Sequence, residues 1–150
     1  MRMLTAATLA AGLAATTALA DAPEIQVFKH ETCGCCDLWI DHMEEAGFRV
    51  QAQNVWDLNG IKDLLGVPLA MSSCHTAVVD GLVVEGHVPA AEILRLLEER
   101  PAGVTGVAVP GMPDGSPGMP APVAERYDVI GFGGGSSARL ATYVGEERID

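Results

Sequence analysis

The chain has 150 residues, of which 49% are apolar and 19% charged, a composition typical of one globular domain and too hydrophobic for a disordered chain. Its 20 acidic residues outnumber 9 basic ones, and the net charge of −11 repels polyanions, which excludes nucleic acid as a partner. Four cysteines, six methionines and four histidines supply the ligand types that soft metal ions prefer.

The first 20 residues are typical of a secretory signal peptide. Arg2 gives the segment a positive start, residues 4–19 carry no charge, and residues 18–20 (Ala-Leu-Ala) have the small-x-small pattern of a cleavage site. An uncleaved membrane anchor is the alternative, but the stretch is short and rich in threonine for a span of about 20 apolar residues. We therefore expect an exported, periplasmic protein of residues 21–150, without stable membrane insertion and in a compartment where disulfides form.

The first predicted elements alternate between strands and helices. Residues 24–29 alternate in polarity and predict a strand. A tight turn over 32–36 then leads into an amphipathic helix, 36–46, which a glycine ends. A second alternating strand covers 48–55, and a short helix over 59–65 begins with an asparagine cap.

The next elements predict a hairpin and a third helix. Residues 75–80 and 82–88 are β-rich runs joined at an Asp-Gly pair, a strong signal for a two-residue hairpin turn. A proline opens a helix over 90–100 and another proline ends it. The order β-α-β-α-β-β-α, with a cysteine motif between the first strand and helix, predicts an α/β, thioredoxin-like three-layer domain.

The composition changes after this helix. Residues 106–122 are so rich in proline and glycine that they exclude a helix or a central strand. Because the stretch starts apolar and holds two methionines, we expect an ordered loop that wraps the domain rather than a flexible linker. Residues 127–130 and 140–144 predict a C-terminal β-hairpin across a turn at 131–137.

The motif Cys33-Gly34-Cys35-Cys36 is the strongest chemical signal. Cys33 and Cys36 have CxxC spacing, and Cys36 falls in the first helical turn, where the peptide dipoles lower a thiol pKa. Three thiols within four residues also suit one soft cation. A structural disulfide is the alternative, either Cys33–Cys36 or one of these with Cys74. The additional Cys35 favours a metal cluster, because a simple dithiol does not need it.

Further candidate ligands lie far along the chain. Cys74 and His75 come just before the predicted third strand, where a thioredoxin-like fold brings the preceding loop against the CxxC turn. Thiolate and imidazole suit Cu(I), Cu(II) and Zn²⁺, but the cysteine spacing is not that of a structural zinc site. Taken alone, Cys74 would better suit a small buried apolar position, but together with the other three cysteines it is predicted as a ligand. Met112 and Met119 carry thioethers that favour Cu(I), or fill a gap over the core, and His87 ranks below His75.

The sequence resembles the exported bacterial metal-binding proteins of copper resistance, the CopG-type family, often described only as a domain of unknown function. The resemblance runs from about 25 to 143 and rests on the cysteine motif, Ser-Cys-His-Thr-Ala at 73–77, Val-Glu-Gly-His-Val-Pro-Ala at 84–90, and Val-Pro-Gly-Met-Pro with Gly-Met at 109–119. It implies a thioredoxin-like fold, a periplasmic location and copper held by cysteines. The residues that match the family's metal-binding motifs are Cys33, Cys35, Cys36, Cys74, His75, His87, Met112 and Met119.

We therefore expect a periplasmic protein that sequesters, relays or redox-cycles one or more ions of Cu(I) or Cu(II), with copper ions and other periplasmic copper-handling proteins as partners. The alternative is a thiol-disulfide oxidoreductase, with Cys33 as catalytic nucleophile and Cys36 as resolving thiol. An intermediate possibility is a cluster that cycles between dithiol-metal and disulfide states. Against a pure oxidoreductase, Ser73-Cys74 stands before the third strand, where such an enzyme presents a proline.

Overall fold

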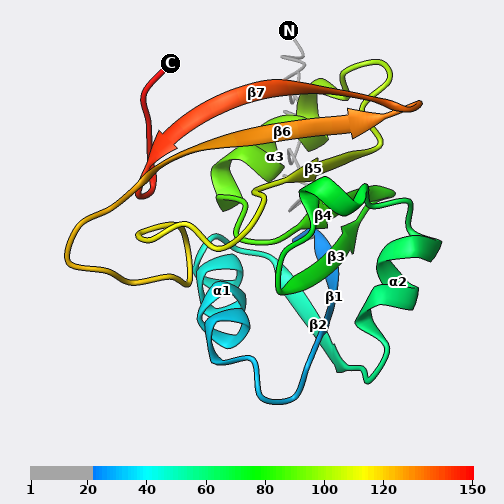
Figure 1. Cartoon of the computed structure of the whole chain (residues 1–150), viewed down its shortest axis with the longest axis horizontal. Helices are drawn as coiled ribbons and strands as arrows, with labels where there is room; N and C mark the ends of the chain where they lie inside the picture. The colour runs from blue at the N-terminus through cyan, green and yellow to red at the C-terminus, as the bar shows by residue number, and fades with distance from the viewer. Residues whose placement is uncertain (1–21) are drawn as a thin grey trace, which may run out of the picture.

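The structure is a computed structural model and describes residues 22–150. These residues form a mixed α/β fold with three α-helices and one sheet of eight strands, in the order β2-β1-β3-β4-β5-β6-β7-β8 (Figure 1). The predicted α/β class is confirmed. The expected signal peptide lies outside the described residues, and within them no helix is long and apolar enough to cross a membrane.

Four strands make the first half of the sheet: β1 (Glu24–Lys29), β2 (Arg49–Asn54), β3 (His75–Val79) and β4 (Leu82–Glu85). β1 pairs in parallel with β2 and antiparallel with β3, which in turn pairs antiparallel with β4. The turn between β3 and β4 uses the predicted Asp-Gly pair. Asp80 and Gly81 have φ values of 46° and 78°, the left-handed conformations that a tight hairpin turn requires.

The helices of the described chain are α1 (Gly34–Glu45), α2 (Leu58–Leu64) and α3 (Ala90–Glu99), with a short 3-10 turn, η1 (Leu69–Met71). α1 begins earlier than predicted, with Cys33 at its N-cap. α2 is capped by Asp57 rather than by the expected Asn59, because the Asp57 carboxylate accepts the N–H of Gly60 at 2.9 Å while Asn59 already lies inside the helix.

The helices cover opposite faces of the sheet. On one face, α1 and α3 bury Trp39, Met43 and Ile93 in the larger hydrophobic cluster, which also contains Val84 of β4. The neighbouring β4 residue, Val83, belongs to the smaller cluster on the other face, together with Leu65 and Val67 of the segment that follows α2. Successive side chains of a strand alternate between the two faces. Neighbouring residues of β4 therefore pack on opposite faces of the sheet, Val84 on the face that α1 and α3 cover and Val83 on the other.

Four more strands extend the sheet: β5 (Gly106–Ala108), β6 (Arg126–Gly133), β7 (Ser136–Val144) and β8 (Glu147–Arg148). β5 pairs in parallel with β4 and antiparallel with β6, so the expectation that 106–122 holds no central strand is wrong at its first three residues. Pro110 is the first proline of that stretch, and the N–H groups before it remain free to pair. The rest of the stretch is an ordered loop.

The predicted C-terminal hairpin is confirmed, but it is longer than expected. Residues 131–137 are mostly strand, and only Gly134 and Gly135 make the turn, with φ values of 57° and 78° that suit a two-residue connection. The long β6–β7 ribbon (orange to red in Figure 1) extends the sheet well beyond the predicted element order. The thioredoxin-like layout can describe only the part from β1 to α3 and stays a prediction.

Candidate metal centre

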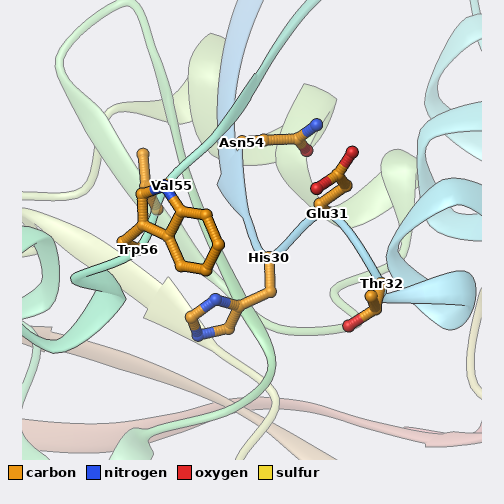
Figure 2. A pocket seen from close by; sticks show the side chains of 6 residues that line it. All are labelled: His30, Glu31, Thr32, Asn54, Val55 and Trp56. Carbon is orange, nitrogen blue, oxygen red and sulfur yellow. The ribbon is translucent and has the colours of Figure 1, made fainter.

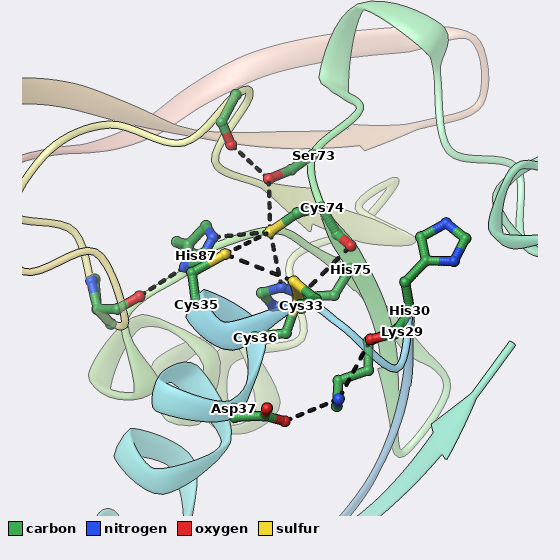
Figure 3. Close-up of a disulfide and its surroundings, with 12 residues drawn as sticks. Lys29, His30, Cys33, Cys35, Cys36, Asp37, Ser73, Cys74, His75 and His87 are labelled. Carbon is green, nitrogen blue, oxygen red and sulfur yellow. Dashed lines mark hydrogen bonds and ion pairs between the residues drawn. A yellow bond between two sulfur atoms is a disulfide. The ribbon is translucent and has the colours of Figure 1, made fainter.

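The start of α1 and the segment before β3 bring four cysteines together (Figure 3). Cys35 Sγ lies 3.6 Å from Cys33 Sγ and 3.7 Å from Cys74 Sγ. All four sulfur atoms, including that of Cys36, lie within 4.8 Å of one another. The convergence expected for the cysteine motif and the loop before the third strand is therefore present, while the role of these residues as ligands stays a prediction.

Two of the sulfur atoms are bonded. Cys33 and Cys36 form a disulfide, one of the pairings that the sequence leaves open, and Cys35 and Cys74 are free thiols. The CxxC spacing across the first turn of α1 brings the two Cα atoms to 5.3 Å, within the range that a disulfide needs. A lowered pKa of the Cys36 thiol stays a prediction for the reduced protein.

His87 follows β4, is fully buried and points at the free thiol of Cys74. Its Nδ1 lies 2.7 Å from the carbonyl oxygen of Pro117, and its Nε2 lies 3.0 Å from Cys74 Sγ. Because Nδ1–H donates to the carbonyl, the unprotonated Nε2 faces the sulfur. A contact of this kind fixes the ring tautomer of a metal-binding histidine. Burial lowers the pKa of His87, which keeps the ring neutral and its nitrogen lone pair free.

His75 also contacts this thiol and lies edge-to-face against His87, with ring centroids 5.0 Å apart. Its Nδ1 is 3.4 Å from Cys74 Sγ, and its Nε2 is the one fully buried side-chain nitrogen or oxygen in residues 22–150 that has no hydrogen-bond partner. The ring packs against Trp39, with centroids 4.4 Å apart, and Trp39 Nε1 is fixed by donating to the Val88 carbonyl at 3.0 Å. Burial holds the pKa of His75 well below its usual range, so this ring is also neutral.

The Cys74 thiol keeps its proton in the metal-free protein. Burial, followed by the neighbouring Cys35, raises the pKa of Cys74 to about 12. Its S–H therefore donates to His87 Nε2. A soft cation that displaces this proton gains a thiolate and an imidazole nitrogen in one step. Since the proton would have to leave, a metal ion bound at Cys74 would be held more tightly as the pH rises.

The proline- and glycine-rich loop folds back onto the start of α1, as expected. A Cβ atom at Gly118 would lie 2.7 Å from the Cys35 carbonyl oxygen and 2.7 Å from the main-chain nitrogen of Trp39, so the close approach of the loop to α1 requires glycine. Within this loop, Met119 is partly buried and Met112 is 52% exposed. The role of the two thioethers as ligands stays a prediction.

A separate pocket of about 170 Å³ opens beside the turn between β1 and α1 (Figure 2). It is lined by His30, Glu31, Thr32, Asn54, Val55 and Trp56. The His30 imidazole lies on this side and away from the sulfur atoms (Figure 3). This agrees with the low rank that the sequence gives His30 as a ligand.

Two kinds of residue at this site are not predicted from the sequence. Lys62 and Glu85 form a buried ion pair that holds the segment before Cys74. A charged residue inside the apolar run 82–88 is a signal that could have revealed Glu85. Pro117 contributes only its main-chain carbonyl, which every residue carries, so the sequence offers no signal for it.

The chain is similar to one family model and to solved structures. The family model "Protein of unknown function, DUF411" matches residues 71–119. Two solved structures named copper resistance protein CopG, Form 2 and Form 1, are each 48% identical to the chain, with TM-scores of 0.77 and 0.76. Each match covers 81% of this chain and 98% of the solved one, and no curated protein matches. On this identity and coverage, the chain belongs to the CopG family of copper resistance proteins.

Proposed function

We propose that the protein binds copper as its cargo and sequesters or relays it in the periplasm. The observation that carries the proposal is the set of four cysteine sulfur atoms within 4.8 Å of one another, next to two buried neutral histidines. The names of the two solved relatives, both copper resistance proteins, support the same assignment. The proposed ligands are Cys33, Cys35, Cys36, Cys74, His75 and His87, with Met112 and Met119 as weak ligands or a cover.

The donor set fits copper better than it fits harder cations. The two clusters contain sulfur and imidazole nitrogen and no carboxylate. Mg²⁺ and Ca²⁺ prefer oxygen ligands, whereas thiolates select soft ions, Cu(I) above all. His75 offers Nδ1 to the same site, 3.4 Å from Cys74 Sγ, while its buried Nε2 has no hydrogen-bond partner in the described residues.

The disulfide adds a redox condition to the proposal. Disulfide sulfurs are poor ligands, so Cys33 and Cys36 hold copper only after reduction. When the reduced pair meets Cu(II), two thiols form the disulfide and release two protons, while their two electrons convert two Cu(II) ions to Cu(I). Cys35, Cys74 and the two histidines remain to hold copper in the oxidised state.

Thiol-disulfide exchange is the second candidate, and the Cys33–Cys36 disulfide at the start of α1 favours it. In this function the partly exposed Cys33 is the nucleophile and the fully buried Cys36 is the resolving thiol. Cys74 has no role in that reaction. A Cys74→Ser variant therefore separates the two functions.

The test is an anaerobic titration of the purified protein with Cu(I), in competition with a coloured chelator, before and after reduction. We expect the reduced protein to bind Cu(I) more tightly than the oxidised protein, and Cys74→Ser to lose most of that affinity while any insulin-reducing activity persists. Equal Cu(I) affinity of the reduced wild type and a variant lacking Cys33, Cys36 and Cys74 would contradict copper binding at this site. Insulin reduction that depends on Cys33, without tight copper binding, would establish the oxidoreductase instead.

A further inference from the structure

The chain contains only two lysines, Lys29 and Lys62, and both are buried against carboxylates near the cysteine cluster. Lys29 pairs with Asp37 of α1 at 2.9 Å, and the Asp37 side chain is largely exposed. Lys62 reaches from α2 to Glu85 at the end of β4, where both partners are withdrawn from water, with exposed fractions of 5% and 0%. Neither member of this second pair belongs to the proposed copper ligands.

The Glu85 carboxylate is fully satisfied by its surroundings. One oxygen accepts from Lys62 Nζ and from the main-chain N–H of Ser73, the latter at 2.6 Å. The other oxygen accepts from Thr76 Oγ1 at 2.7 Å, and Thr76 Oγ1 itself accepts from Lys62 at 2.9 Å. The pair therefore hydrogen-bonds to the chain on both sides of Cys74, at Ser73 before it and at Thr76 two residues after it.

Ser73 continues the network into the methionine-bearing loop. Its hydroxyl donates to the Gly111 carbonyl, and the N–H of Gly111 donates to the Ser72 carbonyl at 3.3 Å. Gly86, with φ +72°, lies so close that an added Cβ atom would stand 2.5 Å from the Ser73 side chain. The segment before Cys74 is therefore enclosed by the end of β4 on one side and by the loop before Met112 on the other.

Stability alone is a poor explanation for this arrangement. Desolvating two charges offsets most of their attraction, and replacing a buried ion pair with apolar residues of similar volume is often neutral or stabilising. An apolar pair, however, has no acceptor for a specific backbone N–H. The Glu85 carboxylate fixes the position of Ser73 by accepting its N–H, which an apolar side chain cannot do. By fixing Ser73, it also fixes the next residue, Cys74.

We propose that the Lys62–Glu85 pair is a positioning device that holds Cys74 and the start of the methionine-bearing loop in place for copper. The inference rests on the proposed function. The pair keeps Cys74 Sγ 3.7 Å from Cys35 Sγ and 3.0 Å from His87 Nε2. Without an acceptor for the Ser73 N–H, the segment relaxes, and the thiol moves away from the other ligands.

The test compares three variants. Lys62→Met with Glu85→Leu removes both charges and the acceptor while keeping the apolar volume. Lys62→Met with Glu85→Gln removes the charges but retains an amide oxygen for the Ser73 N–H. Glu92→Gln is the matched control, because Glu92 is a second buried glutamate whose partners are Arg95, Tyr143 and Arg148. We expect the Leu variant to bind Cu(I) about 10- to 100-fold more weakly, the Gln variant to recover most of this loss, and the control to bind as the wild type does.

A second readout does not involve copper. In the oxidised protein only Cys35 and Cys74 are free, so mass spectrometry after brief alkylation reports how firmly Cys74 is held. We expect faster Cys74 alkylation in the Leu variant and the wild-type rate in the control. If the wild type itself fails to bind Cu(I), the proposed function fails, while the alkylation rates still decide on positioning.

Wild-type Cu(I) affinity together with a wild-type Cys74 alkylation rate in the folded Leu variant would overturn the positioning role. Should that variant not fold, Thr76→Val serves in its place, because it keeps the side-chain shape and removes the hydroxyl that donates to Glu85 and accepts from Lys62. Faster alkylation of Cys74 in Thr76→Val is the expected result. An unchanged rate there overturns the proposal as well.

Discussion

Two buried glutamates stand in the two halves of the molecule and differ in what they hold. Glu85 is neutralised by the buried Lys62 and binds the main chain beside Cys74. Glu92, in the first turn of α3, is neutralised by Arg95 and Arg148, whose side chains are 29% and 37% exposed, and accepts from the Tyr143 hydroxyl. The Glu85 network binds the segment that carries Cys74, a proposed copper ligand, whereas the Glu92 network joins α3 to β7 and β8.

The difference shows that a buried charge is not informative by itself. Both carboxylates are within 1% of complete burial, and both are paired. What separates them is a further partner: the backbone N–H of Ser73, next to the Cys74 thiol, in one case, and the Tyr143 hydroxyl on β7 in the other. We therefore expect damage to the Glu85 side to appear in copper binding, and damage to the Glu92 side to appear in the free energy of unfolding.

The largest expected effect lies at the thiol that the Glu85 network holds. Cys74→Ser removes the sulfur atom that the cysteine cluster shares with the two histidines, so the Cu(I) affinity of the reduced protein should fall by roughly 100-fold or more. This is at least as large as the loss expected when a residue that only orients a metal ligand is changed. Competition titration measures this, with Ser136→Ala at the start of β7 as the control. A Cys74→Ser variant that retains wild-type affinity would remove Cys74 from the site.

The opposite result is expected at the Glu92 side. Burial, followed by the Glu92 charge, raises the pKa of Tyr143 to about 12, so its hydroxyl stays protonated and donates to Glu92 at neutral pH. Tyr143→Phe removes this hydrogen bond and should lower the free energy of unfolding by about 1 kcal/mol without changing Cu(I) affinity. Urea denaturation beside the titration checks both. A large loss of copper affinity here would break the division between the two regions.

His42 connects the two regions and should make their contact sensitive to acid. Its Nε2 accepts the N–H of Ala90, the first residue of α3, at 3.1 Å, and its Nδ1 lies 3.7 Å from Glu146. Burial lowers the pKa of His42, against the opposing charges of Glu146 and Glu45. The folded protein therefore favours the neutral ring, and the unfolded chain binds the proton more readily. This contribution to stability is fully present above the unfolded pKa of about 6.5 and is lost as the pH falls through the folded value.

The measurement compares melting temperatures of the wild type and His42→Gln from pH 8 to pH 5. Glutamine retains an acceptor for the Ala90 N–H but does not titrate. Contributions of His75 and His87 are common to both proteins and cancel in the difference. We expect the difference in melting temperature to be constant at high pH and to shift against the wild type below about pH 6.5. The shift should correspond to a loss of about 1 kcal/mol in the free energy of unfolding, near the value of one hydrogen bond. A difference that is flat over the whole range contradicts the role of His42.

The smallest effect is expected in the loop between the two regions. Changing both Met112 and Met119 to Leu preserves most of the apolar volume, so the free energy of unfolding should change by less than about 1.5 kcal/mol. If the thioethers are weak ligands, Cu(I) affinity falls measurably, and more at low pH, where protons compete with thiolates but not with thioethers. Titrations at two pH values check this. Lost stability with unchanged copper binding would make both residues packing groups.

Local patterns in the sequence were sufficient for most of the elements and for the residue types of the site. The Asp-Gly turn, the proline before α3 and the CxxC motif at the start of α1 act within a few neighbouring residues, and all three are in the structure. β5 was missed because a three-residue strand has too short a pattern to stand out beside the prolines that follow it. The cap of α2 was misplaced because Asp57 and Asn59 are equally good caps by residue type.

The sequence by itself determined that four thiols and two imidazoles are available, and that three of the thiols are close together. Only the tertiary structure decided that Cys35 contacts both Cys33 and Cys74 and that the Pro117 carbonyl orients His87. It also decided that Lys62 and Glu85 hold the segment before Cys74. Apart from the local Cys33–Cys35 contact, these contacts join residues 12 to 39 positions apart, and the one to Pro117 uses a main-chain atom that every residue carries. Side-chain type and local spacing encode neither, because long-range proximity arises only when strands pair and helices pack on them.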